Sequence, residues 1–495
     1  MVAALPYCTT NVQFLEILLS KSGDKFTPSQ PSPLRGGGKG WGGYHRSSLW
    51  LRLCRGVISG ANKKMAFFTV EIEKMVYGGR GMGRVAGKVV FVPFTAPGDR
   101  VQAEVVREKK DYTEAEVKWV ERESPMRVKP FCGLFGKCGG CHYQHLSYPQ
   151  QLKLKEEALK DFLFRLPKSE SMDVLPAIPS PQDREYRIRA QFKSGQEGGK
   201  EVLGFYGQKS HRWVKVNECP LLHPLANEIL EGMQKWLGKK REHSVRQADI
   251  QVSLDEDKGI IRLYGGGHHT PQMAEVLGKE IPGVKGVILE GKKKISWGKL
   301  TLLHRWPKIF GKESLRMRVG YESFSQVNPY QNWNLMQKVV EWADLAGGER
   351  VLDLFCGSGN LTLPLAQRAS MVWGVDRDGR AVEMAAQNAR ENGLGNCTFI
   401  AASVENGTGR ILKETDSIDV VVLDPPRPGA RAALESLALL GPQKILYASC
   451  EPPTLIRDLA RLGALGYRVR RIQPLDMFPQ TYHMEVIADL TKFGR

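Results

Sequence analysis

The sequence predicts three folded domains in the order small β-barrel, central α+β domain, and C-terminal α/β domain with a doubly wound, mostly parallel sheet. Three observations lead to this prediction. Short strand patterns between glycine turns fill residues 65–124, three closely spaced cysteines mark the start of residues 125–325, and strand and helix patterns alternate over residues 326–495. Such alternation is typical of a doubly wound sheet, and 495 residues fit about three domains.

The charge of the chain favours a polyanionic partner. Its formal net charge is +18, and residues 1–64 contribute +7 of this, with nine Lys/Arg and two Asp/Glu. The remaining +11 still favours nucleic acid through counterion release and steering. No apolar run reaches the ~18 residues of a membrane span, and nine cysteines without a secretory leader favour a reducing compartment. We therefore expect a cytoplasmic protein that does not attach to membranes. No obligate protein partner is evident from the sequence, so a monomer is expected.

Residues 1–64 differ from the rest of the chain. The segment 28–43 is rich in proline and glycine and has no usable periodicity, so we expect disorder. Patterned sequence begins directly after Met65, and this suggests that natural translation starts there. A flexible basic tail that helps to bind nucleic acid is the alternative.

Residues 65–124 predict a small barrel of the OB type. Strand patterns lie at 68–73, 88–92, 100–106 and 115–120, and a fifth strand cannot be located. The turns Gly78-Gly-Arg-Gly-Met-Gly83 and Ala96-Pro-Gly-Asp99 separate them and resemble those of the TRAM domain, an RNA-binding barrel. A barrel without a role in RNA binding is equally compatible with the strand pattern alone.

The central residues 125–325 contain a candidate metal site. Cys132, Cys138 and Cys141 lie within ten residues, and Cys219 follows much later. Such thiols can surround one soft centre, with the remote cysteine completing four-thiolate ligation. Structural zinc prefers paired short spacings, so an iron–sulfur cluster is favoured, while zinc and unligated thiols remain alternatives.

Helix patterns at 150–163, 225–237 and 273–279 alternate with strand patterns in this central region. The strand pattern at 185–193 carries Arg187, Arg189 and Lys193, which are candidates for phosphate contacts. A solvated strand face is the alternative, because phosphate contacts have no sequence signature of their own.

The C-terminal residues 326–495 carry a glycine turn after the strand pattern 351–355. Gly357-Ser-Gly359 lacks the third glycine of the dinucleotide fingerprint, because position 362 is Thr. Asp353 precedes the turn and Asp376 ends the next strand, where a carboxylate can accept both ribose hydroxyls. No phosphate-binding Gly-Lys-Ser/Thr follows, so a nucleoside cosubstrate without pyrophosphate is favoured, and S-adenosylmethionine fits.

Cys450 stands where the strand pattern 444–448 ends and a helix pattern begins. Asp424 ends the preceding strand, so both side chains should face the ligand crevice; a helix cap is the alternative role for Asp424. A thiol at this place can act as a nucleophile, and Glu485 offers a carboxylate for proton transfer. Cys356 and Cys397 have no such partner and are interpreted as packing thiols.

Together these motifs resemble the RNA uridine-5-methyltransferases, specifically the iron–sulfur-containing 23S rRNA branch. The resemblance runs from about Met65 to the C-terminus. It rests on the four cysteines, Phe324-Ser-Gln-Val-Asn328, Asp353-Leu-Phe-Cys-Gly-Ser-Gly-Asn-Leu-Thr-Leu-Pro-Leu-Ala366, Asp424-Pro-Pro-Arg427, Ser449-Cys450 and Met477-Phe-Pro-Gln-Thr-Tyr-His-Met-Glu485.

The resemblance implies a Rossmann-like class I methyltransferase domain and a 4Fe-4S cluster on Cys132, Cys138, Cys141 and Cys219. It also implies a nucleophile at Cys450 and a base at Glu485. The implied S-adenosylmethionine contacts come from Gln326, Phe355, Asp376 and Asp424, and Gly357 and Asn360 of the glycine turn are further candidates. Glu451 departs from the family, which usually has Asn after the nucleophile, and a carboxylate beside the thiol tends to raise its pKa.

The expected reaction is methylation of uridine carbon 5 in RNA, with 23S rRNA as the expected substrate and tRNA as the alternative. Thiolate addition at carbon 6 makes carbon 5 nucleophilic, and Glu485 then removes the proton from carbon 5. The target base must leave its stack. Two rival functions remain open at this point: an amino-group methyltransferase, because Asp-Pro-Pro also resembles that class, and a noncatalytic RNA-binding or redox-sensing protein.

Overall fold

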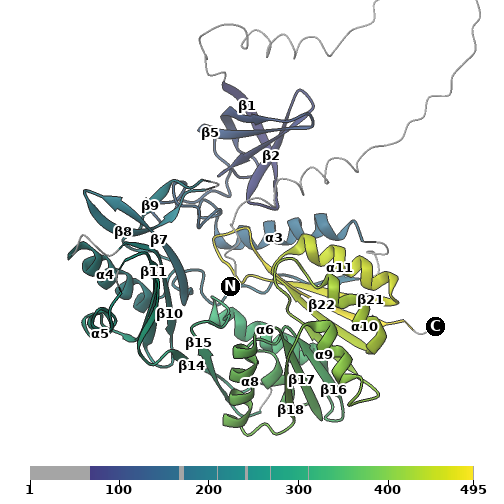
Figure 1. Ribbon diagram of the computed structural model, residues 1–495. Helices are drawn as coiled ribbons and strands as arrows, with labels where there is room; N and C mark the ends of the chain where they lie inside the picture. Colours follow the sequence, from purple (N-terminus) through teal and green to yellow (C-terminus); the bar gives the residue numbers. More distant parts are fainter. Residues whose placement is uncertain are drawn as a thin grey trace, which may run out of the picture. The chain divides into compact units, whose positions relative to one another are not determined.

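A computed structural model describes residues 67–166, 172–208, 210–239, 244–267, 269–309 and 312–493 (Figure 1). The disorder expected for residues 1–64 and the expected start at Met65 lie outside this range. The chain divides into two compact units between Arg127 and Val128. Within the described ranges, every helix is too short or too polar to cross a membrane.

The first unit contains a closed five-stranded barrel with the strand order β1-β2-β3-β5-β4, as predicted. Alternate residues of the strands, such as Val70, Val90 and Val101, fill its core. The strands are β1 (Phe67–Val76), β2 (Arg80–Val85), β3 (Lys88–Pro93), β4 (Arg100–Glu108) and β5 (Tyr112–Arg122).

The fifth barrel strand that the sequence did not locate is β2, which occupies most of the segment interpreted as a glycine turn. Only Gly78 and Gly79 turn the chain, and both have positive φ. A Cβ atom at Gly83 would lie 2.0 Å from the backbone oxygen of Glu71 on β1. The glycines therefore permit close backbone approach inside a strand, where their weak strand propensity conceals them.

The second unit contains a seven-stranded sheet with the order β13-β12-β11-β10-β7-β8-β9. Helices α4 (Pro224–Lys239) and α5 (Pro271–Glu280) contact this sheet and share one apolar core with it. The strands are β7 (Arg189–Glu197), β8 (Lys200–Tyr206), β9 (Trp213–Lys215), β10 (Val245–Ser253), β11 (Lys258–Gly265), β12 (Val284–Glu290) and β13 (Lys294–Gly298).

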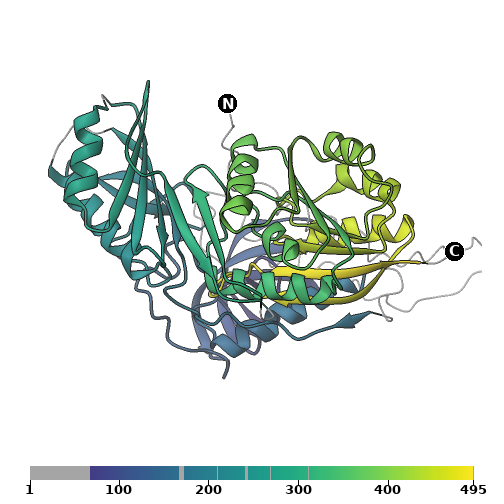
Figure 2. The same ribbon diagram turned by 90° about the horizontal axis from the view of Figure 1, so that it is seen from below.

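An antiparallel pair, β14 (Thr301–Trp306) and β15 (Leu315–Gly320), lies between this sheet and the C-terminal sheet in both views (Figures 1 and 2). Strand β14 contacts β10 and β11, whereas β15 contacts helix α8 (Gly379–Glu391). The pair therefore joins the two sheets of the second unit.

The C-terminal sheet has eight strands in the order β18-β17-β16-β19-β20-β22-β21-β6. Strands β16 to β20 are parallel, and β22 runs antiparallel to both of its neighbours. This confirms the doubly wound, mostly parallel sheet. The strands are β6 (Asp173–Val174), β16 (Arg350–Leu354), β17 (Met371–Asp376), β18 (Cys397–Ala401), β19 (Val420–Leu423), β20 (Lys444–Ser449), β21 (Tyr467–Leu475) and β22 (Glu485–Lys492).

Helices cover the C-terminal sheet. The helices α6 (Pro329–Ala343) and α7 (Thr362–Ala366) share an apolar core with the sheet, and α9 (Val404–Ile411), α10 (Leu434–Leu440) and α11 (Pro452–Ala464) contact one another in series. Helix α11 buries Leu455, Leu459 and Leu462, whose spacing is that of one helical face.

The sequence assigned residues 125–325 to a separate central domain, and the structure groups residues 128–495 as one unit. Helix α3 (Tyr148–Leu163) contacts α11 and β21, and β6 pairs with β21 at the edge of the C-terminal sheet. The segment that holds α3 and β6 therefore packs on the domain that follows residue 325. Strand β6 has two residues, which is too short to leave a pattern in the sequence.

A buried ion pair fixes α3 to the C-terminal region. The Lys155 Nζ donates to the Asp476 carboxylate at 2.5 Å and to the Phe478 backbone oxygen at 3.1 Å. The side chains of Lys155 and Asp476 are 2% and 0% exposed, and burial lowers the pKa of Lys155. Solvent therefore does not stabilise these two charges, and each depends on its partners inside the protein.

We expect Lys155→Met to lower the free energy of unfolding by about 3–5 kcal/mol, because Asp476 would remain buried without its partner. Urea unfolding followed by tryptophan fluorescence measures this change. Lys235→Met is the control, since Lys235 pairs with Glu231 on an exposed helix face and should cost no more than about 0.5 kcal/mol. Equal effects of the two substitutions would contradict a structural role for the buried pair.

Candidate active site

The register of β20 and β22 brings Cys450 and Glu485 together. Ser449 on β20 pairs with Val486 on β22, so the next position along the antiparallel pair sets Cys450 opposite Glu485. Residues opposite each other in such a pair have Cβ atoms about 4.5–5.5 Å apart. Cys450 is half-buried and Glu485 is 1% exposed. The two groups that the sequence proposed as nucleophile and base therefore share one edge of the sheet.

Asp424 follows β19 at the same edge. It accepts a hydrogen bond from the Gln326 side chain, and burial raises its pKa to about 7. Gln326 lies just before α6, whose N-cap Asn328 accepts from the Gln331 backbone N–H at 3.1 Å and donates to the Met477 backbone oxygen. The Gln-Val-Asn motif thus joins the start of α6 to Asp424 and to the segment that leads to Glu485.

The thiol of Cys450 lies in an unfavourable environment for a thiolate. Burial raises its pKa well above the ordinary value, and the carboxyl groups of Glu485 and Asp424 raise it further, while Arg427 opposes them. Glu451 also raises it, as the sequence suggested for a carboxylate beside the thiol. Burial also raises the pKa of Glu485 well above its ordinary value, and the charge of Asp424 adds to this effect.

The glycine turn after β16 forms a second part of the site. The Gly357 backbone N–H donates to Asp376 at 3.0 Å, and a Cβ atom built on Gly357 meets nothing within 4 Å. Phe355 has a φ of 66°, which is rare for a residue with a side chain and marks local strain. The backbone at Gly357 thus borders open space.

Asp353, just before the glycine turn, is a further candidate site residue. Its side chain is fully buried; Oδ2 accepts from Thr362 at 2.5 Å, and Oδ1 accepts no hydrogen bond from a described residue. Burial raises its pKa to about 7, and the nearby charges of Asp424 and Asp376 contribute. Asn360, in contrast, exchanges two hydrogen bonds with Asn332 on α6, so its amide holds α6 against the turn.

The loop from Asp424 to Ala430 is held by α11, the helix that follows Cys450. Asp458 accepts from the Tyr447 hydroxyl at 2.7 Å and from the Ala430 backbone N–H at 2.8 Å, and Arg457 donates to the Pro428 backbone oxygen. Sequence reasoning missed this support. The available signal was the position of Asp458 on the apolar face of α11, where a buried carboxylate needs donors.

The four predicted metal-binding cysteines lie in one neighbourhood. Cys138 is within electrostatic range of Cys132 and Cys219, and Cys141 is within range of Cys138 and Cys219. Backbone N–H groups donate to the sulfurs of Cys138 and Cys219. No group of three or more histidine, cysteine or acidic side chains in the described part of the chain is arranged to hold a metal ion.

Burial raises the pKa of Cys138 to about 11 and that of Cys141 to about 12. Arg187 lowers the pKa of both thiols and of Cys219, and its Nε is buried without an acceptor among the described residues. Arg187 therefore lies close to three of the cysteines, and phosphate contacts of Arg187, Arg189 and Lys193 stay a prediction.

The cysteine loop contacts the segment that ends at Glu485. The backbone N–H groups of His142 and Tyr143 donate to the Gln480 backbone oxygen at 2.9 and 3.0 Å. The rings of His142 and Tyr482 lie 4.7 Å apart in an edge-to-face arrangement. The cysteine loop therefore packs directly against the residues before the carboxylate.

Comparison with known proteins gives the family. A model of the family described as tRNA (Uracil-5-)-methyltransferase matches residues 147–492. The chain belongs to this family. A TRAM domain matches residues 66–118, which confirms the predicted identity of the barrel. The rival interpretations as an amino-group methyltransferase or a noncatalytic protein are not supported.

Related RNA methyltransferases match most of this chain and nearly all of their own length. The chain is 35% identical to an uncharacterized RNA methyltransferase of Caldanaerobacter subterraneus and 36% identical to one of Aquifex aeolicus; each match covers 85% of this chain and 97% of the relative. Among solved structures, it is similar to the Pyrococcus abyssi tRNA (uracil-54, C5)-methyltransferase in complex with S-adenosyl-L-homocysteine. That match has a TM-score of 0.65 and 27% identity, and covers 86% of this chain and 100% of the other.

The methylation rate should rise with pH as the thiol ionises. We expect this rise to occur at a lower pH in Glu451→Asn than in the wild type. The substitution removes a negative charge that raises the pKa of Cys450, and a lower pKa gives more thiolate at a given pH. Because each unit of pKa changes the thiolate population about tenfold, the rate at pH 7 should rise several-fold. The pH dependence of single-turnover methylation measures this.

The matched control is Glu435→Gln on the exposed part of α10, where Glu435 pairs with Arg461. This variant should keep the wild-type pH dependence. An unchanged profile for Glu451→Asn would show that Glu451 does not affect the predicted nucleophile Cys450.

Proposed function

We propose that this protein transfers a methyl group from S-adenosylmethionine to carbon 5 of a uridine in RNA, through a covalent bond between Cys450 and carbon 6. The observation that carries this proposal is the β20–β22 register, which sets Cys450 opposite Glu485 and near Asp424. Membership of the uracil-5-methyltransferase family indicates that the methylated nucleobase is uracil and that the methylated atom is carbon 5.

The strand ends beside Cys450 suit S-adenosylmethionine. Gly357 leaves open space for a ligand, and Asp353 Oδ1 is a buried acceptor with no donor among the described residues. We propose that Gln326, Phe355, Gly357, Asn360, Asp376 and Asp424 line the cosubstrate site, with Asn360 acting through its hold on α6. The bound cosubstrate supplies an electrophilic methyl group on its sulfonium sulfur.

The sulfur of Cys450 forms a bond with carbon 6 of uracil after its proton has passed to a neighbouring carboxylate or to water. The electrons of the carbon 5–carbon 6 double bond move into the ring carbonyl and make carbon 5 nucleophilic. The raised pKa of the thiol limits the resting thiolate population. Arg427, the positive group that lowers this pKa, therefore favours the reactive form.

Glu485 completes the reaction. After methylation carbon 5 still carries its proton; the Glu485 carboxylate removes it, the double bond re-forms and the sulfur–carbon 6 bond breaks. The raised pKa of Glu485 makes its ionised form a stronger base than an exposed glutamate. Its position opposite Cys450 supports proton removal and thiolate release on the same side of one strand pair.

We further propose that Cys132, Cys138, Cys141 and Cys219 hold a 4Fe-4S cluster. In such a cluster each thiolate binds a different iron, so the four sulfurs surround the cluster and need not meet at a single ion. The positive charge of Arg187 beside three of the thiols suits an anionic cluster. When bound, the cluster would hold the cysteine loop together against the segment before Glu485.

The proposed substrate is 23S rRNA, because the cysteine motif resembles that branch of the family. A second candidate is tRNA, which is favoured by the description of the matching family and by the similarity to the Pyrococcus abyssi tRNA enzyme. We propose that the protein acts in the cytoplasm as a monomer. Mass mapping of methylated uridines in rRNA and tRNA of a deletion strain decides between the substrates.

We expect the wild-type protein to form a denaturation-stable adduct with RNA that contains 5-fluorouridine, because Glu485 cannot remove fluorine as it removes a proton. Cys450→Ala should form no adduct and should lose methylation. Cys397→Ala is the control, because Cys397 packs beside the core of the C-terminal domain and should retain both properties. Denaturing gel electrophoresis and peptide mass mapping check these outcomes. Methylation by Cys450→Ala would refute the covalent route.

We expect protein purified without oxygen to contain about four iron and four sulfide per chain. Cys138→Ser should lose most of this iron, whereas Cys397→Ser should retain it. Elemental analysis and visible absorption measure the content and do not depend on activity. Stoichiometric zinc, or equal iron in both variants, would contradict the cluster.

A further inference from the structure

The turn between β12 and β13 carries three consecutive exposed lysines, Lys292, Lys293 and Lys294, and is called the lysine turn here. The Nζ of Lys294 donates to the Glu322 carboxylate at 2.8 Å and is also hydrogen-bonded to the Tyr321 hydroxyl. Lys292 and Lys293 form no ion pair with a residue in the described ranges. The lysine turn thus presents two positive charges that no described acidic side chain neutralises.

Other exposed lysines of the same region are balanced by glutamates. Lys235 on α4 pairs with Glu231, and Lys279 on α5 pairs with Glu275, in each case across one turn of the helix. These helix surfaces therefore carry lysines whose charge is neutralised locally. The lysine turn differs from them because its excess of positive charge is left for a partner.

The lysine turn lies at the border of the sheet face that the helices leave uncovered. Strand β13 contacts α5, and its Ile295 and Trp297 pack against the apolar core that α4 and α5 share with the sheet. Side chains alternate along a strand, so Lys294 points to the opposite face. The lysine turn is therefore accessible from the side of the sheet that carries no helix.

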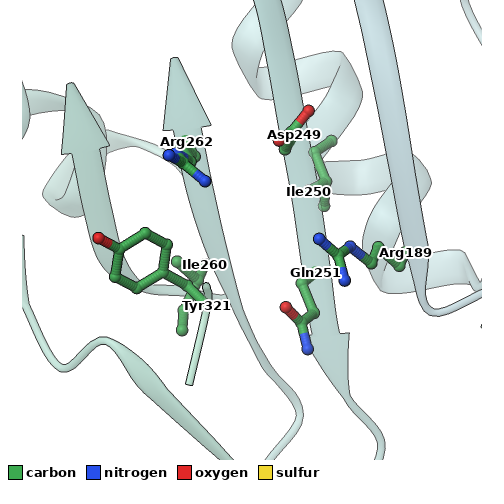
Figure 3. A pocket seen from close by; sticks show the side chains of 7 residues that line it. All are labelled: Arg189, Asp249, Ile250, Gln251, Ile260, Arg262 and Tyr321. Carbon is green, nitrogen blue, oxygen red and sulfur yellow. The ribbon is translucent and has the colours of Figure 1, made fainter. Parts of the chain in front are cut away.

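The middle of this open face is closed to a large ligand. Arg189, Arg262 and Tyr321 border a gap of about 10 Å³, which has room for about one water molecule (Figure 3). A nucleotide cannot enter such a gap. A polyanion that lies on this face therefore meets groups that stand at its surface, and Lys292 and Lys293 are of this kind.

Two acidic groups adjoin the lysine turn, and both have positive partners. Glu290, which ends β12, accepts from Arg262 at 2.6 Å. Glu322 binds Lys294 and also pairs with Arg380 at the start of α8. Neither carboxylate is thus left to cancel the charges of Lys292 and Lys293, and the surface at the turn remains positive.

Unpaired surface lysines suit the phosphate groups of RNA. A lysine binds a phosphate as a point charge, and the contact is favoured by the counterions that the RNA releases. Such contacts position the nucleic acid and do not read its bases. Since the chain belongs to a family of RNA methyltransferases, the polyanion that matches this surface is its substrate.

The lysine turn is joined to the active site through one short segment. Glu322, which binds Lys294, lies four residues before Gln326, which donates to Asp424. Four residues extend over at most about 14 Å, less than the length of one turn of a DNA double helix, about 34 Å. One RNA molecule can therefore contact the lysine turn while a uridine is held beside Cys450.

We propose that Lys292 and Lys293 bind phosphate groups of the substrate RNA outside the part that enters the active site. The inference rests on the proposed function and assigns the central sheet a part in binding the substrate. Lys294 has a separate task in this arrangement, because its bonds to Tyr321 and Glu322 hold the turn against the segment that leads to Gln326.

The test compares two double variants that change the net charge equally. Lys292→Gln with Lys293→Gln removes the unpaired charges, whereas Lys235→Gln with Lys279→Gln removes two paired lysines on the helices. Binding to transcribed 23S rRNA and tRNA is measured over a range of salt concentrations. The turn variant should reduce the slope of log affinity against log salt by about 1.5 and weaken binding roughly tenfold at low salt. The helix variant should keep wild-type values, and replacing both turn lysines with arginine should preserve the slope.

A second measurement uses the wild-type protein and does not depend on the folding of a variant. Bound RNA should protect Lys292 and Lys293 from an amine-reactive acylating reagent. Lys235 and Lys279 should react equally with and without RNA, because they lie on the helices that cover the other face. Mass spectrometry of the peptides measures the extent of acylation at each lysine.

Equal salt slopes in the two double variants, or equal acylation of Lys292 and Lys293 with and without RNA, would overturn the inference. Failure of the wild type to bind RNA would overturn it as well. These readouts require no methyl transfer, so they remain decisive if Cys450 proves not to be the nucleophile. Normal methylation together with equal slopes would refute the phosphate contacts and leave the proposed function standing.

Discussion

The antiparallel pairing of β20 with β22 is the constraint on which the candidate active site depends. In an otherwise parallel run of strands, this reversal brings the start of β22 to the edge where the parallel strands end. It therefore sets a carboxylate directly opposite the thiol that follows β20. Two ionisable groups are buried together as a result, and both have raised pKa values. Asp458 from α11 and Asn328 at the start of α6 hold the loops around this pair in place.

Most of the C-terminal domain was predictable because its strands and helices leave clear periodic patterns and its polar site residues follow strand ends. Cys450, Asp424 and Asp376 were placed by that rule alone. The sequence offered Glu485 as a carboxylate for Cys450, but their register could not be predicted, because strands that are 35 positions apart leave no local signal of pairing. The barrel was recognised from its turns, but β2 was hidden by glycines that serve close packing.

Other features could not be predicted because they depend on distant partners. Strand β6 forms only because the edge of β21 is available to it. Arg187 and Arg189 look alike in the sequence, and only the fold separates them. Arg187 lies close to three of the cysteines, whereas Arg189 lies opposite Gln251 in the seven-stranded sheet. Asp458 is a polar residue on an apolar helix face, and its purpose becomes visible only with the loop that it holds.

The short strand β6 and helix α3 have a consequence for the way this chain can be divided. Together they cover β21, which would otherwise be the last strand of the C-terminal sheet and would present unpaired backbone groups. A fragment that started at residue 326 would expose that edge together with the apolar surface under α3, a combination that promotes strand addition between molecules. The methyltransferase fold of this protein is thus completed by residues that precede it by some 150 positions, and the central sheet is an insertion within it.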